Sequence, residues 1–134
     1  IHACPTKAMQ KREDGIVFID PDLCMGCKYC SWACPYDAPQ YNYKTGLMTK
    51  CDFCMDYIDE GKPPSCVAAC PMRVLDFGEM EELSKKYPDR HVYPLPEETL
   101  TRPALVVKNH TSAKNHAGIK LEIANKEEVG YDKQ

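Results

Sequence analysis

Cysteine is the residue type in this 134-residue chain that most directly implies chemistry, because nine cysteines recur at short spacings. Eight of them form two groups, C-x2-C-x2-C-x3-C-P and C-x2-C-x11-C-x3-C-P, and the ninth also precedes a proline. The first group is Cys24, Cys27, Cys30 and Cys34, the second is Cys51, Cys54, Cys66 and Cys70, and the ninth is Cys4. Thiolates are preferred ligands of soft metal centres. The sequence therefore predicts metal-binding sites.

The first group has the spacing of the bacterial ferredoxin run, in which three thiolates hold one [4Fe-4S] cluster and the fourth binds a second cluster. Gly26 lies inside this loop, where the absence of a Cβ allows a positive φ and a close approach of the backbone to the cluster. Cys30 and Cys34 are four residues apart and fit one helical turn, which Pro35 then ends. This short turn is predicted to connect two clusters.

The second group repeats the end of the first, since Cys66 and Cys70 are again four residues apart and precede a proline. It differs by an eleven-residue insertion before Cys66, which contains Gly61, Pro63 and Pro64. Glycine and proline favour turns and irregular structure, so the insertion is predicted to be a surface loop. Such an insertion lengthens the loop without moving the ligands.

The three Cys-Pro cysteines suggest how ligands are shared, if each binds the cluster of the neighbouring group. One complete set of four ligands would then consist of Cys4, Cys24, Cys27 and Cys30. Three sets would be incomplete: Cys34 alone, Cys70 alone, and Cys51 with Cys54 and Cys66. Their partners are expected before residue 1, so the chain is predicted to be the second half of a four-cluster protein.

Two other uses of these cysteines remain open. The second group could by itself provide the four closed ligands of a structural zinc site. A disulfide framework is disfavoured by the dense spacing and by the absence of a secretory leader. An odd number of cysteines would also leave one thiol unpaired.

Composition argues against several other classes of protein. The net charge is −3 and the basic residues are scattered, whereas nucleic-acid-binding proteins usually carry a basic stripe. No apolar run approaches the length of a membrane span, and no basic-then-apolar segment resembles a targeting leader. The sequence also has no glycine-rich phosphate loop and no paired acid and base. Neither catalytic residues nor a direct small-molecule substrate are therefore expected.

The segments around the cysteines predict short elements. Residues 8–11 and 16–19 are expected to pair as a hairpin around the Asp14-Gly15 turn, and a second extended pair is expected around Thr45-Gly46. After Cys70, the pattern predicts a strand, a break at Gly78 and a short helix over residues 79–87. In this helix one face is formed by Met80, Leu83 and Tyr87. Prolines and polar residues from 88 onward predict an extended tail, either loose or lying across another subunit.

These elements define an α+β protein built of ferredoxin-like modules of the bacterial 2x[4Fe-4S] type, with short hairpins, short helices and an extended C-terminal tail. Residues 1–48 are assigned to part of one module, with the complete ligand set. Residues 49–78 are assigned to part of a second module. Residues 79–134 form the short helix and the proline-rich, polar tail.

The longest cysteine-containing segment, "CPTKAMQKREDGIVFIDPDLCMGCKYCSWACPYDAPQYN", is followed by "MTKCDFC" and "CPMRVLDFG". Together these segments resemble the iron–sulfur, electron-transfer subunit of the anaerobic dimethyl sulfoxide reductase family. The resemblance covers roughly residues 1–107, including "PLP" and "TRPALVVK", and fades beyond them. The absent first half is the departure from the family pattern.

The resemblance implies four [4Fe-4S] clusters in two ferredoxin-like modules, which carry electrons from menaquinol to a molybdenum site. The partners it implies are a molybdopterin catalytic subunit and a quinol-oxidising membrane anchor, in a complex peripheral to the bacterial cytoplasmic membrane. The complete set with Cys4 would belong to the module nearer the anchor. The incomplete set with Cys51 would belong to the module nearer the catalytic subunit.

Related iron–sulfur subunits share the cysteine pattern, including those of polysulfide, thiosulfate and nitrate reductases and of formate dehydrogenase. The catalytic partner decides the substrate among them. Two alternatives from other classes are a freely diffusing ferredoxin and a zinc-stabilised interaction module without a redox role. Iron and acid-labile sulfide distinguish the zinc module from the others.

Overall fold

The computed structural model describes residues 1–90, 92 and 95–110 of the chain. The chain divides into two compact units, Ile1–Phe77 and Gly78–Gln134, and both cysteine groups lie in the first. Within the described residues no helix has the length and apolar character needed to cross a membrane. The predicted division of the first unit into two modules near residue 48 stays a prediction.

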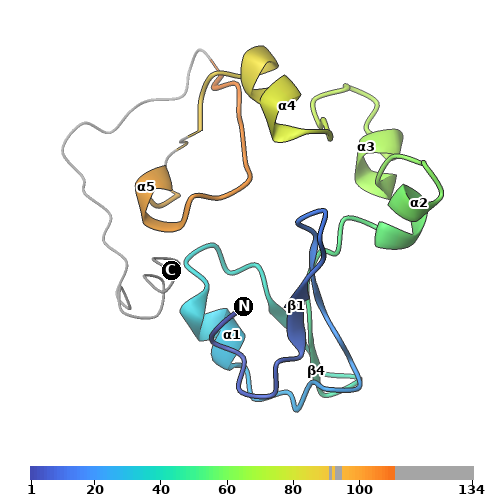
Figure 1. Cartoon of the computed structure of the whole chain (residues 1–134), viewed down its shortest axis with the longest axis vertical. Coiled ribbons are helices and arrows are strands. Elements are labelled where there is room, and N and C mark those ends of the chain that lie inside the picture. The colour runs from blue at the N-terminus through green and yellow to red at the C-terminus, as the bar shows by residue number, and fades with distance from the viewer. Residues whose placement is uncertain (91, 93–94, 111–134) are drawn as a thin grey trace. The chain divides into compact units, whose positions relative to one another are not determined.

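Two antiparallel hairpins provide all the strands of the first unit (Figure 1). Strand β1 (Met9–Lys11) pairs with β2 (Val17–Ile19), and β3 (Gln40–Asn42) pairs with β4 (Leu47–Thr49). The hairpins predicted around Asp14-Gly15 and Thr45-Gly46 are therefore confirmed. Each strand spans only three residues, so neither hairpin is stable by itself and both depend on packing.

Short polar side chains shape the turns of both hairpins. The backbone N–H of Ile16 donates to Asp14 Oδ1 at 3.1 Å, and the N–H of Lys44 donates to Asn42 Oδ1 at 3.0 Å. Asn and Asp favour turns through this kind of bond to the backbone two residues ahead. The turns bring the two strands of each pair back alongside each other.

Three helices of five residues complete the first unit (Figure 1). They are α1 (Tyr29–Ala33), α2 (Met55–Asp59) and α3 (Ser65–Ala69). Helix α1 ends at Cys34 and α3 ends at Cys70, each extended in backbone conformation before a proline, as the sequence predicted. The insertion before Cys66 was predicted to be a loop, and this was wrong in part because α2 occupies its first half.

The second unit contains α4 (Met80–Lys86) and α5 (Glu98–Thr101), with an isolated antiparallel bridge between Asp89 and Val107. Helix α4 confirms the helix predicted over 79–87, and its three apolar positions are the half-buried ones. The strand predicted after Cys70 was wrong, since no strand is present over 74–77. Within the tail predicted to be extended, the short helix α5 follows Pro96. The rest of the predicted tail, 111–134, lies outside the described residues.

The apolar core of the first unit is very small. Ala8, Ile16 and Met48 are the buried hydrophobic side chains among the described residues, with exposed fractions of 1%, 7% and 4%. They come from the two hairpins, and Met48 also lines the pocket described below. A chain with so little buried apolar surface requires additional stabilisation, such as a bound metal centre.

One ion pair connects the first hairpin to α2. Arg12 donates from Nη1 to Asp59 Oδ2 at 3.0 Å and from Nη2 to Asp59 Oδ1 at 2.5 Å, and Nη2 also lies 3.0 Å from Asp14 Oδ2. The hydrogen bonds from Arg12 lower the pKa of Asp59 below its ordinary value of 3.8. A depressed carboxyl pKa stabilises the fold above that value, and the stabilisation is lost as the pH falls through the folded-state pKa.

We expect Asp59→Asn to lower the urea midpoint of the protein slightly near neutral pH. The difference from the unsubstituted protein should shrink as the pH falls below 3.8 and through the lower folded-state pKa of Asp59, where the ion pair is lost. The effect should also weaken at high salt because the pair is exposed. Asp56→Asn, on the same helix, is the control. A pH-independent effect of Asp59→Asn would contradict the assignment.

Candidate iron–sulfur centre

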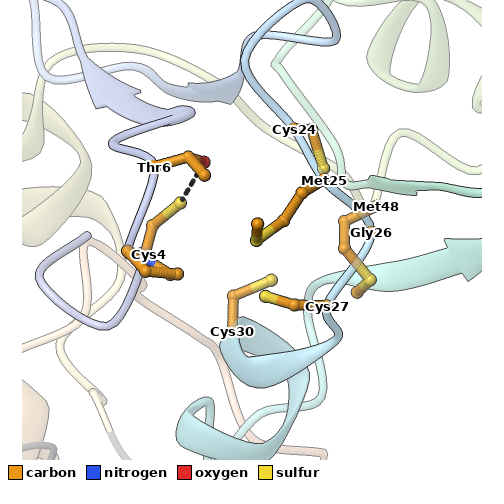
Figure 2. Close-up of a pocket in the computed structure, with 9 residues that line it drawn as sticks. Cys4, Thr6, Cys24, Met25, Gly26, Cys27, Cys30 and Met48 are labelled. Atoms are coloured by element: carbon orange, nitrogen blue, oxygen red, sulfur yellow. Dashed lines mark hydrogen bonds between the residues drawn. The ribbon is translucent and has the colours of Figure 1, made fainter.

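Four cysteines from two separate segments line one pocket in the first unit. They are Cys4, Cys24, Cys27 and Cys30, and the other lining residues are Pro5, Thr6, Met25, Gly26 and Met48. Figure 2 shows Cys4 on one side of the hollow and Cys24 and Cys27 on the other, with Cys30 below them. The structure therefore brings together the four residues that the sequence grouped as one complete ligand set.

Close backbone packing fixes the loop that carries Cys24 and Cys27. Gly26 has a φ of +69°, and a Cβ at this position would lie 2.1 Å from the carbonyl oxygen of Gly46, in the turn between β3 and β4. Only glycine fits such an approach without moving backbone atoms. The second hairpin thus presses directly against the ligand loop.

The start of α1 orients Cys30 toward the same pocket. Lys28 has a left-handed φ of +65° and precedes the helix, and its carbonyl oxygen accepts hydrogen bonds from the Ser31 backbone N–H and hydroxyl at 3.0 and 2.8 Å. The Lys28 ammonium lies 4.0 Å from the centroid of the Tyr41 ring on β3, within cation–π distance. These contacts join the ligand loop, the helix and the second hairpin.

The Cys4 thiol sits in a different setting, formed by the turn that follows it. Thr6 Oγ1 lies 3.5 Å from Cys4 Sγ (Figure 2). Burial raises the pKa of Cys4, but hydrogen bonds from the Thr6 side chain and from the backbone N–H groups of Met9, Ala8 and Thr6 outweigh it and lower that pKa overall. These donors favour the thiolate, which is the form that binds metals.

All three Cys-Pro segments adopt the same turn. The third residue after each cysteine has a left-handed φ, and these residues are Lys7 (+58°), Asp37 (+51°) and Arg73 (+51°). In each turn the N–H of that residue donates to the cysteine carbonyl oxygen, at 3.2, 3.2 and 3.3 Å respectively. Successive N–H groups in such a turn form a concave site for an anion. Each Cys-Pro turn is thus suited to hold a thiolate.

The third Cys-Pro turn has the same electrostatic effect as the first. Backbone N–H groups of Leu75 and Val74, followed by those of Met72 and Arg73, lower the pKa of Cys70. Cys30 is affected in the opposite direction, because burial and then the negative charges of Cys27, Cys4 and Cys24 raise its pKa. Four thiolates this close repel one another until positive metal ions compensate their charge.

The second cysteine group lies outside the pocket around Cys4. Cys54 Sγ contacts Ser65 Oγ at 3.6 Å, and Ser65 is the first residue of α3 and directly precedes Cys66. The carbonyl oxygen of Cys51 accepts a hydrogen bond from Lys50 Nζ at 2.6 Å. Cys34 and Cys70 are not among the residues that line the pocket around Cys4. The ligand sets assigned to these cysteines stay predictions.

The arrangement of the thiols bears on the kind of metal centre. Among the residues that the structure describes, no three His, Cys, Asp or Glu side chains converge as they would around a single metal ion. The four cysteines lie around one pocket, with Cys4 on the opposite side from the ligand loop and the Met25 side chain extending between them (Figure 2). A polynuclear iron–sulfur cluster is bound by thiolates at its corners. The donor set therefore fits the cluster predicted from the sequence.

Comparison with known families agrees with this geometry. Residues 1–80, more than half of the chain, match the model of the 4Fe-4S dicluster domain. This chain is a member of the 4Fe-4S dicluster family. Its cofactors are accordingly [4Fe-4S] clusters, and the structure of this dicluster protein shows four of its nine cysteines around one pocket.

Curated relatives of this dicluster protein come from several reductase and dehydrogenase complexes. One chain of the anaerobic dimethyl sulfoxide reductase of Escherichia coli is 50% identical over 127 residues, which is 94% of this chain and 62% of the relative. A subunit of the sulfite dehydrogenase of Allochromatium vinosum is 43% identical, covering 78% of this chain and 48% of the relative. One chain of the polysulfide reductase of Wolinella succinogenes is 45% identical, covering 64% and 46%. The protein described here thus spans less than two thirds of these relatives.

Sequence reasoning missed two contributors to the site. One is the Thr6 hydroxyl beside Cys4, and the other is the set of left-handed residues in the Cys-Pro turns. Lys7 and Arg73 carry no sequence signal for a left-handed φ, which is uncommon for long side chains. The repeated Cys-Pro pair could have indicated these turns, because the same local sequence at three places in the chain suggests the same local structure.

Proposed function

We propose that the chain is part of an electron-transfer subunit that carries [4Fe-4S] clusters and has no catalytic site of its own. The observation that carries this proposal is the gathering of Cys4, Cys24, Cys27 and Cys30 around one pocket. The match to the dicluster family and the 50% identity to a chain of dimethyl sulfoxide reductase support it. The fold class is proposed to be ferredoxin-like, as the two hairpins followed by cysteine loops suggest.

We further propose the full ligand assignment. The complete cluster is held by Cys4, Cys24, Cys27 and Cys30. Cys51, Cys54 and Cys66 provide three ligands of another cluster, and Cys34 and Cys70 each provide one ligand to two more. The remaining ligands are supplied from outside residues 1–134. The equivalence of the three Cys-Pro turns supports this, because all three present N–H groups in the same way.

The proposed partners are a molybdopterin catalytic subunit and a quinol-oxidising membrane anchor, so the subunit would lie at the surface of the bacterial cytoplasmic membrane. The relatives are each named as one chain or subunit of an enzyme, which supports a multi-subunit complex. The likeness to a chain of dimethyl sulfoxide reductase over 94% of this chain favours dimethyl sulfoxide over polysulfide, thiosulfate or formate as the substrate of the complex. The relatives from polysulfide reductase and sulfite dehydrogenase cover less of the chain, which makes those substrates the second choice.

A bound [4Fe-4S] cluster supplies reversible one-electron transfer without bond making or breaking at a substrate. The residues of this chain set the conditions for that transfer. Backbone N–H groups around Cys4 and Cys70 stabilise the negative charge on sulfur, which affects the reduction potential. Gly26 lets the ligand loop pack closely against the second hairpin, which keeps the thiols of Cys24 and Cys27 in place.

The proposal is tested by purifying the full-length subunit within its complex under anaerobic conditions and measuring iron, acid-labile sulfide and the EPR spectrum after reduction. About sixteen irons per subunit are expected if four [4Fe-4S] clusters assemble. Zinc without iron or sulfide would instead support a structural interaction module. A stable monomer with intact clusters and no partner would support a diffusing ferredoxin.

A further inference from the structure

Lys50 has a position unlike that of an ordinary surface lysine. It lies between the end of β4 and Cys51, and it is partly buried. Its ammonium donates hydrogen bonds to the carbonyl oxygen of Val17 on β2 and to that of Cys51, the latter at 2.6 Å. The side chain thus connects the first hairpin to the first ligand of the second cysteine group.

The surroundings of Lys50 combine burial with negative charge. Burial lowers the pKa of Lys50, while the nearby negative charges of Cys51, Asp52 and Cys34 act in the opposite direction. Taking an ammonium out of water is unfavourable unless hydrogen bonds and opposite charges compensate. Two carbonyl oxygens provide the hydrogen bonds, and two of the three charges are cysteines assigned above to clusters.

Cys51 is assigned above to a cluster with Cys54 and Cys66. We propose that Lys50 is a positioning residue for this cluster site, which anchors the Cys51 loop to β2 and holds a positive charge beside Cys51. This inference rests on the proposed function. It adds a specific non-ligand residue that affects the reduction potential of the cluster bound by Cys51.

The physical effect has a definite sign. Reduction adds a negative charge to a cluster, and a fixed cation nearby stabilises the reduced form more than the oxidised form. Lys50 is therefore expected to raise the reduction potential of the cluster bound by Cys51. Lys44 and Lys62 differ from Lys50, since Lys44 is exposed in the turn between β3 and β4 and Lys62 pairs with Glu60 on the surface. Lys44 is therefore a suitable control within the same unit.

The test is redox titration of the intact subunit in its complex, followed by EPR, with the variants Lys50→Met, Lys50→Arg and Lys44→Met. The signal of the Cys51 cluster is identified beforehand as the one lost in Cys51→Ala. In Lys50→Met, the equilibrium constant for reducing this cluster should fall about tenfold, which equals about 59 mV for one electron. Lys50→Arg should have a reduction potential close to that of the unsubstituted protein, and Lys44→Met should leave the potential unchanged.

Four results decide the inference. Intact clusters with unchanged potentials in Lys50→Met would overturn it and leave the proposed function standing. Loss of the Cys51 cluster in Lys50→Met with retention in Lys50→Arg would support the anchoring role. Equal loss in both variants would overturn the role of charge. Absence of all cluster signals from the unsubstituted complex would remove the proposed function and this inference with it.

Discussion

Replacing Cys4 or Cys30 by alanine should abolish the same EPR signal, whereas replacing Cys34 should abolish a different one. Cys4 is 26 residues from Cys30 in sequence, yet both line the same pocket. Cys34 follows Cys30 by one helical turn and does not line that pocket. Sharing a cluster is thus decided by the fold and not by nearness in the chain.

The expected loss in each single variant is one cluster, about four irons, from the intact subunit in its complex. Iron analysis measures the loss, and the EPR spectrum after reduction shows which signal has gone. Alanine is preferred to serine because it provides no oxygen that could replace the thiolate. The double variant Cys4→Ala with Cys30→Ala should lose no more iron than either single variant, because both residues serve one cluster.

Cys34→Ala is the matched control, since it removes a cysteine from the end of the same helix. The double variant with Cys30→Ala and Cys34→Ala should lose two clusters. Loss of the Cys34 signal on replacing Cys4 would contradict the sharing of ligands between segments. Loss of two signals from the Cys4 variant alone would show that Cys4 has a wider structural role than that of a single ligand.

Gly26→Ala should destabilise the first cluster site far more than the corresponding change at Gly61. Both glycines have positive φ, +69° and +72°, so alanine is strained at either position by about 1–2 kcal/mol. At Gly61 an added Cβ meets nothing within 4 Å. At Gly26 it would lie 2.1 Å from the Gly46 carbonyl oxygen, a backbone atom that cannot rotate away.

The added cost of forcing the backbones apart is about 1–3 kcal/mol, as for other insertions into packed sites. The visible absorbance of the clusters can be followed during an anaerobic guanidinium titration. This absorbance should be lost at a lower guanidinium concentration in Gly26→Ala than in Gly61→Ala. EPR should assign the early loss to the cluster bound by Cys4. Equal midpoints for the two variants would mean that the ligand loop moves away from the second hairpin without cost.

The cofactor and the local elements follow from sequence because they depend on short-range spacing. Cys30 and Cys34 fit one helical turn at any position in a fold, and Pro35 disfavours helix at Cys34 wherever it occurs. Asp14 and Gly15 form a turn by local hydrogen bonding and a permissive φ. Helices α2, before Cys66, and α5, in the tail after Tyr87, were not predicted from sequence. Both are short helices whose formation depends on tertiary contacts more than on intrinsic helix propensity.

The sequence by itself determined that this protein binds [4Fe-4S] clusters, because the type of ligand and the spacing of the ligands are both properties of the covalent chain. It also assigned Cys4 to the next run of cysteines. Only the tertiary structure placed Cys4 opposite Cys24 and Cys27, packed Gly26 against Gly46, and brought Lys50 to Val17. Those contacts join residues 20 or more positions apart, and they arise from packing of the hairpins, which no local pattern encodes.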